Sequence, residues 1–470
     1  MNRVSTLPIS FFFIACFFTC LSVQCQKNPS NTLVEYELDL GQTVAQHYIH
    51  IDVLNGKKEK LEVYNISMQD QMHKNVCNFS VESNGQFLEY KTNPKHVKKN
   101  DKIIKDVYMY SIILDPPLEQ DQSTSLIVKM LTRKSITPVQ SSIPQTSHSF
   151  LVQHNGSSTL FSPYKTEILN MRIHLKGKLE EINASVPYQF DSQSFTVTLD
   201  TQYKLSSFTQ TNLSLKFWSN HSLVSFSHLE RTVKVSHWIN TVINNTVSIE
   251  NLTPKIKGAF SRLRQESDPF GGLPILDVQQ LADHAINPKY GDVLGKIHSF
   301  VHEEDRLMLV MRYPLFGGWK TMFYTSYDSP LNEIASISGS WPIKVTLKLK
   351  FIPVYYPVAQ INKAVMNVVL PKGAFNVNVA PSCHPENYVV TYETRKQMFS
   401  QMWIAVIKRT PLSTYSSDEE ITITYDYPPW FILQTPLLYA AIYYVLCSIL
   451  MIVRHLFSPS PDSPSKEKTK

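Results

Sequence analysis

The sequence predicts a mainly β protein: two tandem β-sandwich-like domains followed by one C-terminal transmembrane helix. Three observations indicate this class. Apolar and polar residues alternate in many short segments, a long apolar run without charged residues lies near the C-terminus, and 470 residues exceed a common domain length about threefold. The clearest alternating segments are 194–199, 213–218, 344–350 and 421–425. Helical periodicity is scarce, and residues 277–285 are the best candidate for a short helix.

Composition excludes several classes of protein. The net charge is +6 and only 18% of residues are charged, which excludes a highly charged disordered chain and a strongly basic nucleic-acid binder. The 28 Pro and 14 Gly, together with 23 Tyr and 24 Phe, argue against collagen-like or Gly-rich repeats and favour aromatic-rich strands with many breaks. Six Cys are too few for a disulfide scaffold of this size.

The N-terminus has the features of a secretory signal peptide. One basic residue, Arg3, precedes an apolar run over residues 9–23, which falls short of the ~20 residues that a membrane span needs. We therefore predict a signal peptide over residues 1–25, with cleavage after Cys25 or, alternatively, after Ser22. An uncleaved membrane anchor is the other interpretation, and the short apolar run argues against it.

A second apolar run, residues 431–453, predicts the transmembrane helix. It carries no charged residue and would extend about 34 Å as a helix, enough to cross a bilayer. Trp430 precedes the run, and Arg454 and His455 follow it, so the basic flank is expected in the cytosol. The chain is then a single-pass type I protein with residues 26–430 in the secretory lumen or outside the cell. A buried core helix is the alternative, but the run has no polar face.

Polar residues in and after this span indicate membrane partners and a retrieval signal. Gln434 must either reach the interface or hydrogen-bond another membrane helix, and we favour the second, which implies membrane partners. The cytosolic tail, residues 454–470, is rich in Ser and Pro and is expected to be unstructured. Lys466 and Lys468 stand fifth and third from the end, which resembles the dilysine signal for retrieval to the endoplasmic reticulum.

A faint internal repeat divides the lumenal part into β domain 1, residues 26–233, and β domain 2, residues 234–430. The expected equivalences are 126–130 with 307–311, 163–166 with 314–321, 170–175 with 365–370, 179–186 with 375–379, and 195–201 with 388–394. Chance similarity between short strand patterns is the alternative explanation, because half-buried strands all share one alternation.

Acceptors for N-linked glycans are confined to residues before 252. The Asn-X-Ser/Thr sites are Asn65, Asn78, Asn155, Asn183, Asn212, Asn220, Asn244 and Asn251. Asn28 is excluded by Pro29, and Pro254 weakens the site at Asn251. Because a bulky glycan does not fit in a protein contact, we expect the first domain to face solvent and the second to be covered by partners or membrane. The alternative is that the acceptors merely follow Asn- and Ser-rich stretches.

Motifs that carry chemistry are missing from the sequence. It has no G-x-S-x-G, H-E-x-x-H, C-x-x-C, P-loop or dinucleotide-binding pattern, and we expect no catalytic residue, no cofactor and no metal. The one cluster that suggests a metal site consists of His298, His302, Glu303, Glu304 and Asp305. Zinc needs a closed shell of ligands that nothing nearby supplies, so we interpret this cluster as a solvated loop.

Two further features have structural interpretations. Apart from a possible terminal Cys25, the mature lumenal part contains Cys77 and Cys383, which either form a disulfide between the domains or remain buried thiols. His237 and Trp238 follow a short alternating segment, and we expect them to serve strand packing rather than catalysis.

Three stretches are distinctive: Val-Lys-Val-Ser-His-Trp at 233–238, Gly-Ala-Phe-Ser-Arg at 258–262, and the segment 312–321. In the third, a strand is expected to end at Pro314, and the two glycines that follow permit a turn. These residues, in this order, closely resemble the ribophorin I family. The most specific residues of the resemblance are Pro314, Phe316, Gly317, Gly318, Trp319 and Lys320. The resemblance reaches from residues 34–40 through 162–166 to the span.

The resemblance implies a non-catalytic subunit of the oligosaccharyltransferase complex of the endoplasmic reticulum. This complex transfers an oligosaccharide from dolichyl diphosphate to Asn-X-Ser/Thr of nascent proteins. In the family's complex, a multi-pass partner with a Trp-Trp-Asp-Tyr-Gly motif and a divalent metal is catalytic, and the present sequence has neither that motif nor several spans. The implied partners are the other subunits including the catalytic one, nascent polypeptides, the lipid bilayer and the translocon, but no nucleic acid. The implied role is complex stabilisation or substrate presentation.

The sequence departs from the animal members, which continue beyond the membrane into a long cytosolic domain. The 17-residue tail is too short to fold as such a domain, so we expect no ribosome anchoring through it, and the short form resembles fungal members. A single-pass cell-surface adhesion or receptor ectodomain is the alternative from another class, and Lys466 and Lys468 argue against it. A lumenal glycan-processing enzyme is a second alternative, disfavoured because no recognisable carboxylate pair is present.

Overall fold

The structure, a computed structural model, describes residues 28–99, 102–303, 305–339, 341–381, 387–397, 400–414 and 419–457. It is mainly β, with 59% of residues in strands and 10% in helices, and it has one long apolar helix towards the C-terminus. The predicted fold class is therefore confirmed. The predicted signal peptide, Glu304, Cys383, and the two lysines of the dilysine signal lie outside the described residues.

The chain forms two compact units. Unit 1 consists of Met1–Val224, Asn251–Pro274 and Phe316–Gly318, and unit 2 of Ser225–Glu250, Ile275–Leu315 and Trp319–Lys470. The predicted division between residues 233 and 234 falls inside strand β17 (Val224–Lys234), and the chain returns to unit 1 twice after it first leaves. The two lumenal β domains with the bounds 26–233 and 234–430 stay a prediction.

Unit 1 contains one large sheet and two small sheets. The large sheet has the order β14 (Tyr188–Asp191), β15 (Thr196–Leu205), β12 (Lys165–His174), β1 (Ser30–Asp39), β2 (Ala45–Leu54), β8 (Ser123–Thr132), β4 (Val76–Ser83) and β5 (Gln86–Phe87). One small sheet is β13 (Leu179–Ala184), β16 (Asn212–Ser219), β11 (Phe150–Ser157) and β9 (Ile136–Pro138). The other is β3 (Leu61–Gln69), β7 (Lys102–Leu118) and β6 (Tyr90–Lys99). The remaining elements are β10 (Ser142–Ile143), its partner β19 (Lys255–Ile256), and the helices α1 (Asp70–His73) and α2 (Arg262–Ser267).

Unit 2 has the same kinds of sheet. The large sheet has the order β22 (Gly295–Ile297), β21 (Ile286–Asp292), β25 (Lys320–Ser329), β18 (Thr241–Asn251), β17, β30 (Ala364–Val369), β33 (Ser400–Arg409) and β32 (Val389–Gln397), with β29 (Gln360–Ile361) and β34 (Leu412–Ser413) beside it. The small sheets are β26 (Ala335–Ser338), β27 (Ile343–Lys350), β35 (Glu420–Tyr427) and β31 (Phe375–Pro381), and β23 (Phe300–Glu303), β24 (Arg306–Leu315), β20 (Ile275–Leu281) and β28 (Tyr355–Tyr356). The helices are α3 (Leu331–Ile334) and α4 (Phe431–Phe457).

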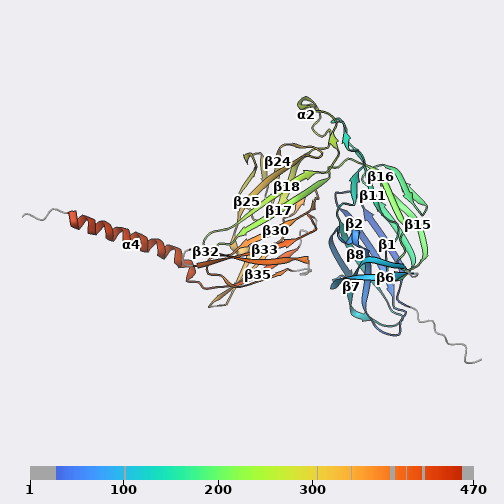
Figure 1. Cartoon of the computed structure of the whole chain (residues 1–470), viewed down its shortest axis with the longest axis horizontal. Coiled ribbons are helices and arrows are strands. Elements are labelled where there is room, and N and C mark those ends of the chain that lie inside the picture. Colours follow the sequence, from blue (N-terminus) through green and yellow to red (C-terminus); the bar gives the residue numbers. More distant parts are fainter. Residues whose placement is uncertain are drawn as a thin grey trace, which may run out of the picture. The chain divides into compact units, whose positions relative to one another are not determined.

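The two units repeat one strand order. The series β15-β12-β1-β2-β8-β4 of unit 1 corresponds, in chain order, to β33-β30-β17-β18-β25-β21 of unit 2. Figure 1 labels β1, β2 and β8 of the first series and β17, β18 and β25 of the second. The small-sheet series β13-β16-β11-β9 likewise corresponds to β31-β35-β27-β26. Within the large sheets, β1 runs parallel to β12 and β17 runs parallel to β30, whereas β2 and β8, like β18 and β25, are antiparallel. The internal repeat is therefore present as a repeat of topology.

Only part of the expected residue equivalence within the repeat is correct. Segments 170–175 and 365–370 lie along the equivalent strands β12 and β30, and 179–186 and 375–379 begin the equivalent strands β13 and β31. The other three pairs are wrong, because β8, β12 and β15 have their counterparts in β25, β30 and β33 rather than in 307–311, 314–321 and 388–394. Neighbouring half-buried strands share one alternation, so sequence similarity alone does not distinguish them.

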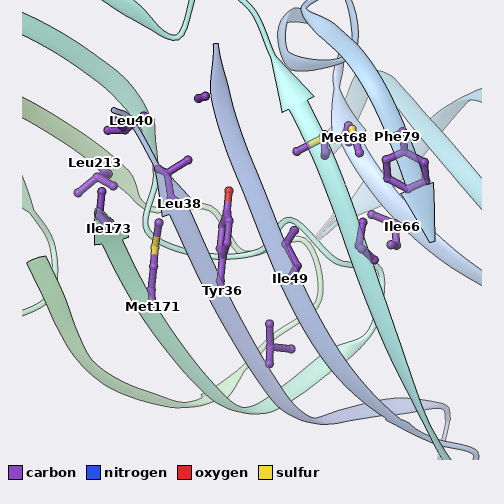
Figure 2. Packing of buried hydrophobic residues seen from close by; sticks show 14 of the residues in the cluster. Tyr36, Leu38, Leu40, Ile49, Ile66, Met68, Phe79, Met171, Ile173 and Leu213 are labelled. Carbon is purple, nitrogen blue, oxygen red and sulfur yellow. The ribbon is translucent and has the colours of Figure 1, made fainter. Parts of the chain in front are cut away.

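Alternation explains why these segments form strands. Tyr36 on β1 lies in register between Met171 on β12 and Ile49 on β2, as Figure 2 shows, and all three side chains are buried. Residues from the large sheet and from both small sheets of unit 1 form one hydrophobic cluster. Full burial of each such side chain stabilises the fold by ~1.5–3 kcal/mol.

The predicted helix over 277–285 is wrong. Residues 275–281 form strand β20, which pairs with β24. Val278 and Gln280 are both buried, two positions apart, so a period of two places them on the core face. Pairing with β24 also satisfies the backbone hydrogen bonds of this segment. The segment therefore forms a strand despite its weak helical periodicity.

The predicted span forms a continuous helix. Helix α4 has 27 residues and is about 40 Å long. Pro436, its sixth residue, lacks the N–H that would otherwise bond to the Ile432 carbonyl four residues earlier. The length and composition of α4 allow it to cross a membrane. The indole Nε1–H of Trp238 donates to the carbonyl of Ile432 at 2.9 Å, and the His237 ring stacks on Tyr427. His237 and Trp238 follow β17 rather than lying in it, and they pack against β35 and the start of α4.

Candidate functional site

A cavity of about 590 Å³ within unit 1 is the candidate binding site. This volume lies in the range of roughly 300–1,000 Å³ that is usual for small-ligand pockets. The cavity is lined by residues of β1, β2, β3, β8, β11 and β16. Strand β3 belongs to one small sheet, and β11 and β16 belong to the other. In the described part of the chain, the two small sheets do not pair with each other, and the cavity is lined by residues of both and of the large sheet.

Part of the cavity wall is apolar. Leu38, Ile49, Met68, Met130 and Leu213 are all buried, and they come from five different strands or strand ends. Figure 2 shows four of them, Leu38, Ile49, Met68 and Leu213, around this part of the core. Met72 of α1 also lines the cavity. Methionine side chains are unbranched and adaptable, so these three in the wall allow the cavity to accommodate apolar groups of different shape.

A chain of hydrogen bonds forms one polar end of the cavity. The Tyr36 hydroxyl lies 2.7 Å from Nδ1 of His47, and Nε2 of that ring lies 2.8 Å from Oγ1 of Thr132. The same Thr132 oxygen is 2.7 Å from Oγ of Ser135, and the Ser135 carbonyl is 2.8 Å from Nδ1 of His154. These polar groups satisfy one another, so they are stable without a ligand.

Both histidines at this end are neutral. Burial, with a smaller contribution from nearby His154, lowers the pKa of His47 to about 3. Burial likewise lowers the pKa of His154 below its usual range. Burial disfavours the charged imidazolium because it removes the water that would solvate it. The inner end of the cavity is therefore polar but uncharged at physiological pH.

The outer part of the cavity is amide-rich and cationic. Gln69 at the end of β3 and Gln210 before β16 form a reciprocal hydrogen-bonded amide pair across the space between the two small sheets. Arg133 and Lys134, in the turn after β8, also line the cavity, and Lys134 is exposed. Among the described residues that line it there is no Asp or Glu. The entrance therefore favours an anionic group.

Three predicted glycosylation sites lie on the same rim. Asn155 on β11 and Asn183 on β13 both pair in register with Ser214 of β16, so their side chains share one face of this sheet. Asn212 lies two residues before Ser214 and faces the same way. All three Asn side chains are exposed and line the cavity entrance. Glycans on them would surround the entrance.

The remaining predicted glycosylation sites differ in exposure. Asn220 is exposed, whereas Asn65, Asn78 and Asn244 are half-buried. Asn251 is fully buried, and its Nδ2 donates to the carbonyl of Leu273 at 3.1 Å. A glycan on this nitrogen is incompatible with the observed packing. Occupancy of the other seven sites stays a prediction.

The motif segment has a structural role in unit 1. Phe316 is fully buried, and its ring packs 5.5 Å from that of Phe260. A Cβ on Gly317 would lie 2.0 Å from the carbonyl oxygen of Pro254, so only glycine fits there. Gly318 has a φ of +75°, and its N–H donates to the Asn251 carbonyl at 2.7 Å. These contacts explain the two adjacent glycines.

The flanking motif residues lie at the surface or close to it. Trp319 is 37% exposed, and Pro314 lies half-buried near the end of β24. Lys320 at the start of β25 forms an ion pair of 3.1 Å with Glu250.

The suspected metal cluster does not assemble in the described part of the chain. His302 and Glu303 lie in β23 opposite Leu307 and Arg306, and His298 precedes this strand. Among the described residues, no three His, Cys, Asp or Glu side chains are placed to hold a metal ion. Cys77 is buried on β4, and its pairing with Cys383 stays a prediction.

The stability of unit 1 should fall in acid because of His47. An unfolded chain binds a proton on this ring near pH 6.5, whereas the folded chain does so only near pH 3. Its contribution is therefore complete above pH 6.5 and is lost progressively as the pH falls from 6.5 towards 3. We expect a loss of about 2 kcal/mol between pH 7 and pH 5.

Hydrogen exchange of the β2 and β8 amides at the two pH values, corrected for intrinsic exchange rates, measures this loss. His47→Asn should reduce the pH dependence, and buried His154, whose pKa is also lowered by burial, accounts for part of what remains. An equal pH dependence in wild type and His47→Asn would show that another group is responsible.

Comparison with known proteins gives the family. The fold defines a class: a mainly β chain with a duplicated topology and one helix able to cross a membrane. The family described as Ribophorin I matches residues 30–454, so the chain belongs to the ribophorin I family.

Relatives within this family carry informative names. The Arabidopsis thaliana protein named dolichyl-diphosphooligosaccharide–protein glycosyltransferase subunit 1A is 24% identical over 447 residues, covering 92% of this chain and 71% of the relative. The Caenorhabditis elegans subunit 1 of the same name is 23% identical over 376 residues, covering 77% of this chain and 62% of the relative. This chain therefore spans less than two thirds of the nematode protein.

Similarity to solved structures is weak. An M1 zinc metallopeptidase from Deinococcus radiodurans aligns with a TM-score of 0.26 and 10% identity, covering 45% of this chain and 48% of the peptidase. This level of similarity supports no inference about activity.

Proposed function

We propose that this chain is a non-catalytic subunit of the oligosaccharyltransferase complex in the membrane of the endoplasmic reticulum. The observation that carries the proposal is the family match over residues 30–454, together with the names of the plant and nematode relatives. The chain supports transfer of the dolichol-linked oligosaccharide to Asn-X-Ser/Thr by stabilising the complex or presenting the substrate. A multi-pass partner subunit performs the transfer itself.

A type I arrangement fits the described contacts. In this arrangement α4 crosses the bilayer, both β units lie in the lumen, and Arg454 and His455 lie in the cytosol. The Trp238 hydrogen bond to Ile432 brings an amphipathic aromatic ring to the start of α4, where the interface would lie. The exposed acceptors Asn155, Asn183 and Asn212 would then face the compartment in which glycans are added.

A polar residue of α4 supports membrane partners. Gln434 lies in an apolar helix, where an amide is costly unless it is hydrogen-bonded. Ser448 offers the matched control, because its hydroxyl already donates to the Tyr444 carbonyl of the same helix at 2.9 Å. Gln434→Leu should therefore weaken association within the membrane, and Ser448→Ala should not.

Affinity purification of the full chain in mild detergent tests the proposal. We expect the multi-pass catalytic subunit and other oligosaccharyltransferase subunits to co-purify, with less of them on Gln434→Leu than on Ser448→Ala. Any glycans on the chain should stay sensitive to endoglycosidase H, as expected for a resident of the endoplasmic reticulum. Recovery without these subunits, with complex-type glycans, would favour a cell-surface ectodomain instead.

A further inference from the structure

The cavity of unit 1 has no role in the proposed function. It combines a partly apolar wall, an inner polar end whose groups satisfy one another, and an entrance that carries cationic side chains. Each of these features restricts what can occupy it.

The inner end does not suit a charged group. The hydrogen-bonded chain from Tyr36 through His47 and Thr132 to Ser135 is complete within the protein. A buried charge placed there would lose its hydration without gaining an opposite charge. A ligand that fills the cavity therefore presents an uncharged part to this end.

The entrance does suit a negative charge. Arg133 and Lys134 line it, and no carboxylate is present among the described lining residues. The amides of Gln69 and Gln210 supply further donors at the same entrance. An anionic group held there keeps part of its hydration, since Lys134 is exposed.

The middle of the cavity suits a single flexible apolar chain. Buried Leu, Ile and Met side chains form part of its wall, among them Met68 on β3 and Met130 on β8. A hydrocarbon chain packs against these side chains without needing a hydrogen bond.

We propose that unit 1 binds an anionic amphiphile, with one alkyl chain in the cavity and a carboxylate or phosphate at Arg133 and Lys134. The chain enters between β3 and the start of β16, beside the Gln69–Gln210 pair. Glycans at Asn155, Asn183 and Asn212 would leave room for such a slender ligand and hinder a folded protein. This inference is independent of membership in the glycosyltransferase complex.

Photolabelling of the full chain in lipid nanodiscs tests the proposal. The probes are a diazirine-bearing alkyl carboxylate, the matching alkyl phosphate and the matching alkyl alcohol, and the labelled peptides are mapped by mass spectrometry. We expect the anionic probes to label β3, β8 and β16. Lys134→Glu should lower this labelling about fivefold and leave labelling by the alcohol unchanged.

Two controls make the result decisive. Lys58→Glu reverses an exposed charge of unit 1 that does not line the cavity, and it should have no effect. Labelling by the carboxylate and the phosphate separates the two head groups, and either supports the proposal.

Labelling confined to α4, equal labelling by the alcohol, or labelling unaffected by Lys134→Glu would overturn the proposal. So would an apolar photoactivatable peptide that labels these strands when the anionic probes do not, since the occupant would then be polypeptide. If Lys134→Glu fails to fold, the test is a competition on the wild-type chain. Unlabelled alkyl carboxylate should then reduce labelling by the anionic probe, and the unlabelled alcohol should not; equal competition by both would overturn the proposal.

Discussion

Replacing Glu419 by alanine is expected to destabilise unit 2 by about 3–5 kcal/mol. Glu419 and Arg409 form an ion pair in the interior, with side chains 9% and 4% exposed. The Tyr388 hydroxyl hydrogen-bonds to this carboxylate, and Nη1 of Arg409 donates to the same hydroxyl at 3.0 Å. Removal of the carboxylate leaves the guanidinium in a poorly hydrated place without this counter-charge. Amide hydrogen exchange of β33 and β35 in the full chain measures the loss.

Two further variants separate this explanation from mere loss of packing. The double variant Arg409→Met/Glu419→Leu removes both charges, so it should recover much of the stability that Glu419→Ala loses. Glu119→Ala breaks the ion pair with Lys60, in which both side chains are largely exposed, and it should leave stability unchanged. If the double variant is less stable than Glu419→Ala, the buried charge of Arg409 is not the cause.

Replacing Gly317 by alanine is expected to cost at least about 3 kcal/mol, near the upper end for overpacking. The new Cβ would lie 2.0 Å from the Pro254 carbonyl oxygen, and backbone atoms on both sides would have to move. The movement would also disturb Phe316, which is fully buried, and the hydrogen bond from Gly318 to Asn251. Thermal unfolding of the full chain, with hydrogen exchange of the β10 and β19 amides, measures this cost.

Gly258→Ala is the matched control for the glycine effect. Gly258 has a φ of +86°, but a Cβ added there would meet nothing within 4 Å, so alanine costs only the left-handed backbone conformation, about 1–2 kcal/mol. If Gly317→Ala loses no more stability than Gly258→Ala, the backbone around the Pro254 contact relaxes easily.

Much of the fold follows from local pattern. Segments 213–218, 344–350 and 421–425 lie in β16, β27 and β35, because alternation of apolar and polar residues is a property of each strand alone. The charge-free run at 431–453 lies in α4 for a similarly local reason. Local pattern does not show which strands pair with one another. For this reason, three of the five expected equivalences within the repeat are wrong.

The candidate site could not be predicted from the sequence, because the residues that form it lie far apart in the chain. His47 and His154 lie on β2 and β11, and neither stands in a recognisable motif. They come together because the small sheet that contains β11 packs against the large sheet that contains β2. The Gly317-Gly318 turn was predictable, since two glycines permit it. The contact with Pro254 that requires Gly317 was not, because it joins distant segments.

In the proposed function, this chain assists oligosaccharide transfer and a partner subunit performs it. The most direct measurement compares the transfer of a dolichol-linked oligosaccharide to an Asn-X-Thr peptide by three preparations: the purified chain, the complex depleted of the chain, and the depleted complex with the chain restored. We predict no transfer by the chain alone, reduced transfer by the depleted complex, and recovery when the chain is added back. Transfer by the chain alone, or full activity of the depleted complex, would contradict the account.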